Sequence, residues 1–493
     1  MLHVLSCVAA LAVGAPSEAD AYRPLVQTEV GGFQLELPLL FSSTVDGGGD
    51  FAVDRDGQTF AGDPAVGPRV RLGLLARSTT LVDRATLTFE YEHDLFGGFV
   101  VGRPELVGYQ LPTSADLTTF PRKAYLQLAT QAGWHLFGGL TMSQSGLGLF
   151  ANDGGRGWTP WGQVFSDPRA GDRVLRLAAA VGPATDLGAF FTLAGDYVIS
   201  DDLIEPGDDA FQLTFRGEVG KLKPTNGSLS LTYRHQSGVE GARLDALVVG
   251  VFGETRFTQG AAAYYVGAEA VGVFGSAALV PLPPHPTQAV RQLGAALKAG
   301  IDLGKLSLQL DAVVASGDED PNDDQLTGYR TDSSFGFGLV LFRRVLAAQT
   351  GRAVASASNP ALVGRGIVGI DRVATRGAVT NTFAIFPRLA LQLVDGLEFS
   401  AGPMFAFALA TPMDPFNSRI AGGSPRNALD GSPGRFWGTE VDFALRYRRL
   451  LGTSELLLGV EGGVLIPGSA LAGAGDVPID SIPAGRAVVQ LRL

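Results

Sequence analysis

Residues 305–329 read KLSLQLDAVVASGDEDPNDDQLTGY, and they contain one complete unit of the pattern that decides the fold. The first half alternates, which predicts a strand: Leu306, Leu308, Leu310, Ala312 and Val314 lie on one face, and Ser307, Gln309, Asp311 and Ala315 on the other. The second half, 316–324, is an acidic loop that neither a strand nor a helix would carry in its interior. In a sandwich this unit would occur only a few times. Because it recurs along nearly the whole chain, it favours a membrane β-barrel whose apolar face meets lipid.

Segments of this alternation can be followed from one end of the chain to the other. Those before the acidic loop are 33–41, 69–77, 85–95, 122–130, 133–142, 173–182, 188–198, 209–220, 228–237, 243–252, 261–273, 289–302 and 305–316. Those after it are 380–393, 396–409, 436–448, 454–465 and 485–493. We therefore predict an all-β fold, a transmembrane antiparallel barrel of about 18 strands.

The lengths of the connections support a barrel independently of the strand pattern. Counted from the first strand, most odd-numbered connections are long: 42–68, 96–121, 143–172, 274–288, 317–379, 410–435 and 466–484. The odd connections 199–208 and 238–242 are short, and so are all the even-numbered ones. Long loops on one side and tight turns on the other are typical of outer-membrane barrels, whose turns lie in the periplasm.

The same parity decides how residues 334–343 (SFGFGLVLFR) are interpreted. As a strand they would put the short turn after 393 on the long-loop side, so we assign them to the connection 317–379. A connection of this length is too long for a plain turn, and we expect it to fold into or over the pore as a constriction. Its apolar side chains would then pack on the barrel wall: Phe335, Phe337, Leu341 and Phe342.

The composition agrees with a single barrel domain over residues 22–493. No apolar run reaches the ~20 residues that a membrane-spanning helix needs. Residues 1–21 are predicted to be an export signal with a cleavage site at Ala19-Asp20-Ala21, and a buried N-terminal helix is the alternative. The only cysteine, Cys7, lies in this segment, so no disulfide is expected. A net charge of −11 argues against nucleic acid as a partner.

Strand phase places many charged side chains on the polar face, which lines the lumen of a barrel. Of the 38 basic residues only five are lysines, a bias that suits paired charges in a confined lumen and that a GC-rich genome would also produce. A ring of charge would select ions by sign, whereas charges of both signs could instead cancel in a ladder that only holds the wall. The candidates are Arg69, Arg71, Arg216, Arg234, Arg243, Arg388, Arg446, Arg448, Arg486 and Arg492, with Glu90, Glu92, Glu218, Asp245, Asp311, Glu440 and Asp442 on the same face.

The acidic loop offers carboxylates that could bind Ca²⁺: Asp318, Glu319, Asp320, Asp323 and Asp324. It is not an EF-hand loop, because Asp323 stands at the sixth position where Gly is needed and Tyr329 at the twelfth where Glu is needed. A solvated acidic loop is the simpler interpretation. We expect no other cofactor.

Residues 233–238 (YRHQSG) resemble the His-x-Ser motif of outer-membrane phospholipase A. His235 and Ser237 share the lipid-facing side of a strand, but a catalytic pair also needs a third group that orients the His. No Asn occurs between Asn226 and Asn322 to do so. We therefore expect no enzymatic activity, and an interfacial role for His235 beside Tyr233. A lipid hydrolase is kept as an alternative.

Residues 310–323 (LDAVVASGDEDPND) and 359–364 (NPALVG) resemble the alginate export family of outer-membrane channels. The resemblance is local, and it implies an eighteen-stranded barrel with an Arg-lined lumen that passes a polyuronate. We therefore expect passive transport of an anionic oligo- or polysaccharide across the outer membrane, with a general or differently selective porin as the alternative. The expected partners are outer-membrane lipid, the barrel-assembly machinery and a small or polymeric solute.

Overall fold

The computed structural model describes residues 26–78, 85–96, 119–153, 171–221, 223–238, 241–280, 285–320, 323–363, 369–452, 454–473 and 475–493. The predicted export signal, 1–21, lies outside these residues. Among the described residues, no helix is long and apolar enough to cross a membrane.

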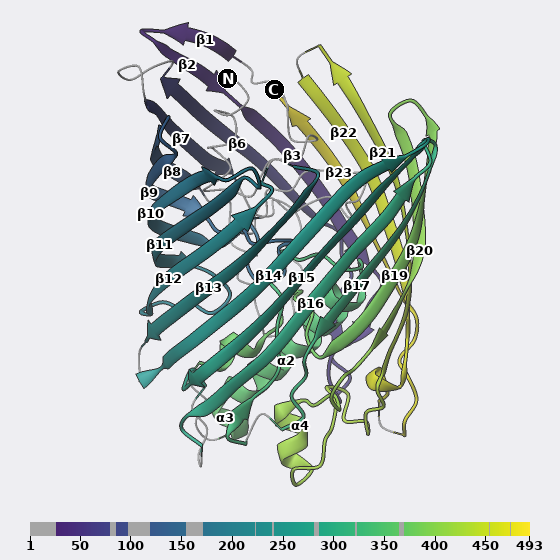
Figure 1. The fold of residues 1–493 in the computed structure, drawn as a ribbon. Helices are drawn as coiled ribbons and strands as arrows, with labels where there is room; N and C mark the ends of the chain where they lie inside the picture. Colours follow the sequence, from purple (N-terminus) through teal and green to yellow (C-terminus); the bar gives the residue numbers. More distant parts are fainter. Residues whose placement is uncertain are drawn as a thin grey trace.

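The strands form a closed antiparallel barrel, as the sequence predicts (Figure 1). Each strand pairs with the next, and β23 pairs with β3 to close the wall. The 18 barrel strands are β3 (Leu39–Gly48), β6 (Ala65–Ser78), β7 (Ala85–Phe96), β8 (Phe120–Thr130), β9 (Trp134–Met142), β10 (Arg173–Ala184), β11 (Ala189–Ser200), β12 (Asp209–Val219), β13 (Thr225–Ser237), β14 (Arg243–Gln259), β15 (Ala262–Ala277), β16 (Gln288–Asp302), β17 (Leu306–Ala315), β19 (Thr382–Val394), β20 (Leu397–Phe407), β21 (Phe436–Leu451), β22 (Ser454–Pro467) and β23 (Ile482–Arg492).

The exterior of the barrel is apolar because one face of each strand carries large aliphatic and aromatic side chains. On β12, Phe211, Leu213 and Phe215 are exposed, whereas the side chains between them are polar and point inward. This alternation repeats around the wall, and it leaves a belt of exposed apolar side chains that only lipid can cover favourably.

The two ends of the barrel differ, as the connection lengths predict. In Figure 1 the tight turns lie at the top with both marked chain ends, and the long connections lie at the bottom, where they carry α2 (Ala347–Ser358), α3 (Pro360–Val363) and α4 (Pro415–Ile420). Other short elements in these connections are β4 (Phe51–Ala52), β5 (Thr59–Phe60), β18 (Gln325–Leu326), η4 (Leu341–Leu346), η5 (Ile370–Val373) and η6 (Ser469–Leu471).

The first barrel strand lies later in the sequence than predicted. The predicted segment 33–41 covers β2 (Phe33–Leu37) and only the beginning of β3. Both pair with β6 in one continuous register, since Glu36 lies opposite Leu75 and Leu39 opposite Leu72. Pro38 interrupts the strand between them because it has no N–H to donate. The first long connection is therefore shorter than the predicted 42–68.

A further strand, β1 (Val26–Val30), pairs with β2 beyond the end of the barrel wall. Val26 lies opposite Leu37, while Leu493 exchanges both backbone hydrogen bonds with Leu39. β1 therefore continues the line of β23, and one position, opposite Pro38, separates the two.

Residues 334–343 do not form a barrel strand, which confirms their exclusion. They run into the interior and lead into η4 and α2. Their side chains Phe335, Phe337, Leu341 and Phe342 are at most 3% exposed and belong to one apolar cluster with inward-facing wall residues such as Phe386 and Met404. The lumen therefore contains packed protein, and the interior is not lined by polar residues alone.

Candidate pore lining

The strands next to the closure of the barrel carry carboxylates that are each shared by two arginines. Glu461 on β22 accepts from Arg446 on β21, with 3.0 Å between Nη2 and Oε1, and from Arg486 on β23, with 2.8 Å between Nη2 and Oε2. Nearer the tight-turn end of the same strands, Glu455 lies between Arg448 and Arg492. Two guanidinium groups share one carboxylate in each cluster, and Glu398 on β20 lies a further 3.9 Å from Arg446. The two clusters together join four guanidinium groups to three carboxylates.

The same arrangement occurs on the other side of β3. Asp94 on β7 accepts from Arg69, at 3.2 Å, and from Arg71, at 2.6 Å between Nε and Oδ1, both on β6. Because only β3 separates β6 from β23, these clusters form one basic stripe along adjacent strands. Its next members on β7 and β8 are the pairs Arg122–Glu92 and Lys123–Glu90. Arg122 and Lys123 were not among the predicted lumen residues, because the alternation of their own strand does not mark them as lumen-facing.

The remaining lumen candidates are also paired. Arg388 on β19 contacts Asp311 on β17, Arg234 contacts Asp201, and Arg216 lies 3.0 Å from Glu218. Nine of the ten candidate arginines point inward, and so does Asp311; the exception is Arg243. Each of the inward-facing residues takes part in an ion pair, so a structural ladder is present at every one of them.

Two of the charged residues assigned to the lumen, Arg243 and Asp245 on β14, point outward, so this assignment is wrong. The side chains on the opposite, inward face of β14 are apolar: Leu244, Ala246 and Val248. They pack in the main apolar cluster against residues 329–346, which we call the inserted segment. Residues 338–341 are its tip. The rule that polar residues face the lumen fails here because protein, and not water, fills the lumen at β14.

Glu440 on β21 points inward but does not pair with an arginine. Its carboxylate accepts the backbone N–H groups of Leu339, Val340 and Leu341, with 2.8 Å between Oε2 and the nitrogen of Leu341. Glu269 on β15 accepts the N–H groups of Leu147 and Leu149 in the same way, at 2.8 and 3.1 Å. Two segments of long connections are therefore bonded to the inner wall.

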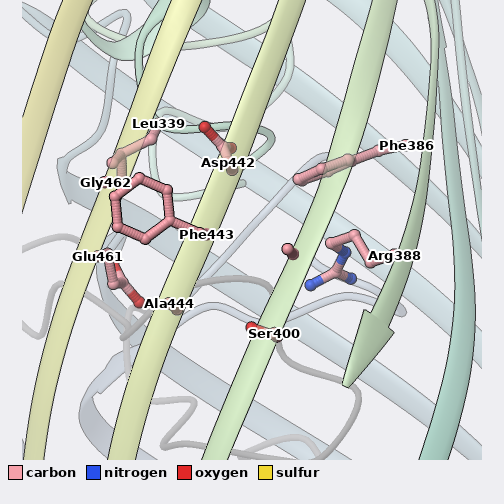
Figure 2. A pocket seen from close by; sticks show the side chains of 10 residues that line it. Leu339, Phe386, Arg388, Ser400, Asp442, Phe443, Ala444, Glu461 and Gly462 are labelled. Carbon is pink, nitrogen blue, oxygen red and sulfur yellow. The ribbon is translucent and has the colours of Figure 1, made fainter. Parts of the chain in front are cut away.

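A small hollow lies between the tip of the inserted segment and the wall of β19 to β22. Figure 2 shows Arg388, Ser400, Asp442 and Glu461 around it, with Leu339 and Phe386 as its apolar side. The hollow is therefore lined by a cation, a hydroxyl and carboxylates beside an apolar side.

The acidic loop uses its carboxylates to hold its own backbone. Asp318 accepts the N–H groups of Asp320 and Thr327, at 3.1 and 3.0 Å, and Asp323 accepts that of Gln325 at 2.8 Å. Within the described residues, no group of three His, Cys, Asp or Glu side chains has a geometry that could hold a metal ion.

The His-x-Ser motif lies on the outward face of β13, near the long-loop end of the barrel. His235 Nδ1 lies 2.7 Å from Asp245 Oδ1, because the two residues are directly opposite each other on β13 and β14. Asp245 also accepts from Tyr233 and Arg243. The sequence search considered only Asn as the orienting group and so missed Asp245.

No protein-family model matches the chain, and no curated protein matches it. Among solved structures, the chain resembles Pseudomonas aeruginosa OpdK with vanillate, with a TM-score of 0.53 and 11% identity over 93% of this chain and 98% of that one. It also resembles OccK2 (OpdF) of the same organism in complex with glucuronate, with a TM-score of 0.52 and 11% identity over 93% and 98% of the two chains. At this identity the likeness concerns the fold alone, and OpdK is an outer-membrane protein. The exposed apolar belt requires lipid, so the chain is an outer-membrane barrel.

Proposed function

We propose that this barrel is a passive channel for a small anionic solute, such as a uronate or a short acidic oligosaccharide. The observation that carries the proposal is the basic stripe. In the described residues from β20 to β8 across the closure, eight cations form ion pairs with six carboxylates: Arg69, Arg71, Arg122, Lys123, Arg446, Arg448, Arg486 and Arg492 against Glu90, Glu92, Asp94, Glu398, Glu455 and Glu461. Asp153, whose carbonyl accepts from Arg122 and whose carboxylate attracts Arg71 and Lys123, adds a seventh negative charge beside them. A surplus of one sign on a low-dielectric wall raises the local concentration of the opposite ion.

Two acidic residues on β21 act against this surplus. Glu440 is occupied by three backbone N–H groups of the inserted segment, which offset its charge locally. Asp442, which lines the hollow, lowers the surplus further. The sign of selectivity therefore depends on the stripe.

Two further observations support a carboxylate solute of modest size. The similar barrels OccK2 and OpdK were crystallised with glucuronate and vanillate, both of which carry a carboxylate. The inserted segments occupy part of the lumen, which favours a monomer or short oligomer over the polymer implied by the resemblance to the alginate export family.

A planar bilayer under a salt gradient tests the sign of selectivity. We expect a reversal potential that reports anion preference and that weakens in Arg446→Glu. The matched control is Arg243→Glu, which makes the same charge change on the outward face and leaves the potential unchanged. Cation preference of the unmodified protein would remove the anionic solute and leave the barrel fold intact.

The bond between His235 and Asp245 favours a second candidate, an outer-membrane lipid hydrolase. The structure provides a base and its orienting carboxylate, but no hydrogen bond joins Ser237 to His235 among the described residues. We expect purified protein to release no fatty acid from phospholipid, with or without Ca²⁺. Release that disappears in Ser237→Ala would overturn the choice of a channel without enzymatic activity.

A further inference from the structure

Two glutamates of the barrel wall point into the lumen and bind backbone. Glu440 is fully buried and Glu269 is 3% exposed, although both stand on strands where such a side chain would otherwise face water or an arginine. A buried carboxylate is costly unless charge-assisted hydrogen bonds compensate for its lost hydration. Here backbone N–H groups provide that compensation.

The N–H groups bound by Glu440 are those that a helix leaves unsatisfied. Leu341 begins the continuous helical run of η4 and α2, and Leu339 and Val340 directly precede it. The first N–H groups of a helix have no partner within the helix, and a carboxylate at that end also interacts favourably with the helix dipole. Val340 itself offers no side-chain cap, so a strand on the wall provides it.

Glycines next to both contacts show that the backbone approaches the wall closely. Gly338 has φ +70°, and a Cβ there would lie 2.9 Å from Glu440 Oε1. Gly146 has φ +45°, and a Cβ there would lie 2.6 Å from the Glu269 carboxyl carbon. Both positions combine a left-handed backbone with no space for a side chain, which only glycine tolerates without strain.

The two anchored segments also bind each other. The carbonyl of Leu149 accepts from the N–H of Asp332 at 2.9 Å and from the hydroxyl of Tyr329 at 3.2 Å. The N–H of Asn152 donates to Asp332 Oδ2 at 2.9 Å. Residues 143–153 and 329–346 therefore form one body inside the barrel, with one anchor on β15 and the other on β21.

We propose that Glu440 and Glu269 are the positioning residues that fix this body against the wall and so set the width of the pore. The proposal deepens the proposed function, since the width matters only if the barrel conducts. Arg344 ties the helical run to the wall through Asp46 on β3, and Arg352 ties it to the first long connection through Asp54. The loss of Glu440 should therefore free the tip while the helical run stays attached.

Thiol labelling tests the anchoring without any need for conduction. In a background with Cys7, the only cysteine, replaced by Ser, Val340→Cys places a thiol at a fully buried position of the tip. We expect slow labelling by a water-soluble maleimide, at least tenfold faster labelling when Glu440→Ala is added, and an intermediate rate with Glu440→Gln, which keeps one acceptor oxygen. Leu149→Cys reports on Glu269→Ala in the same way.

The matched control is Glu461→Gln, which removes a wall carboxylate bonded to Arg446 and Arg486 and should leave Val340→Cys protected. A heat-dependent shift in gel mobility shows for each variant that the barrel has folded. Fast labelling with Glu440 intact, or equal protection with and without it, would overturn the anchoring.

In bilayers, Glu440→Ala should raise the conductance at least twofold. If labelling responds and the conductance does not, the anchors hold the body but do not set the width. Cation preference would instead contradict only the proposed anionic solute.

Discussion

At the scale of single residues, Gly338 is the position where the inserted tip depends most on having no side chain. Gly338→Ala would force φ +70° on an alanine, which costs roughly 1–2 kcal/mol, and it would place a methyl group against Glu440. We expect hydrogen exchange at the N–H groups of Leu339, Val340 and Leu341 to accelerate at least about tenfold, since ~1.4 kcal/mol corresponds to that factor.

The control for this prediction is Gly260→Ala in the turn between β14 and β15. Gly260 has φ +62° but open space around a Cβ, so the substitution adds the backbone cost alone and leaves the tip unchanged. Equal exchange in Gly338→Ala and the unmodified protein would show that the tip is not held by the Glu440 contact.

Asp332, which lies in the inserted body and not in a strand, gives that body a dependence on pH. Burial raises the pKa of its carboxyl from 3.8 to about 8, and the Asp202 carboxylate adds to the shift. The protonated form is therefore favoured in the folded body. Its contribution to stability is fully present below pH 3.8 and is lost as the pH rises through about 8.

We expect the protection of the Asn152 and Ser334 N–H groups, corrected for the intrinsic pH dependence of exchange, to fall as the pH is raised and to level off above about 8. Asp202→Asn removes a neighbouring negative charge and should move the midpoint to lower pH. Asp56→Asn, at an exposed position, should leave it in place. A pH-independent protection would contradict the assignment.

Residue by residue, the sequence allows the face of a wall side chain to be predicted but not its partner. Arg446 and Glu440 share one face of one strand, and the period of two places both in the lumen. Arg446 donates to Glu461 on another strand, and Glu440 accepts from the backbone of a loop some hundred residues away. No local sequence pattern encodes either contact. Arg243 and Asp245 were assigned to the wrong face because that pattern does not show where the lumen is filled.

At the scale of elements, strands were predictable wherever one face meets lipid, because lipid imposes strict alternation. Segment 334–343 was excluded by loop parity and not by its own composition. The first strand was predicted to end at residue 41, whereas β3 continues to Gly48 and Pro38 separates it from β2. The predicted number of strands is unaffected, because β2 and β3 follow one register along β6 and count as a single wall strand.

The outward face of β12 allows a direct test of membrane contact. Leu213 lies near the middle of the strand and is 54% exposed. Leu213→Arg should lower the free energy of unfolding in lipid vesicles by ~2–4 kcal/mol, as expected for Arg at the bilayer midplane. Its neighbour Gln212 faces the lumen, and Gln212→Arg should cost much less. Similar losses in urea titrations of the two variants would place the bilayer elsewhere.

At the scale of the whole molecule, the closed barrel predicts bulk behaviour. Protein refolded into detergent should give a strand-dominated circular dichroism spectrum, and boiling should change its mobility on a gel, because every wall strand is paired on both sides. Solubility without detergent, or a helix-rich spectrum, would contradict a barrel with an exposed apolar belt.

The alignment of β1 with β23 means that the order of the strands along the gene is not essential to the barrel. Leu493 and Val26 are separated by the single position opposite Pro38, so one added residue could join them without disturbing any pairing. A circular permutant with this join, an export signal at its new start and new ends in the loop between β13 and β14 should close into the same wall, since surface loops tolerate new termini. Synthesis would then begin with a different strand, while the pore would keep its shape.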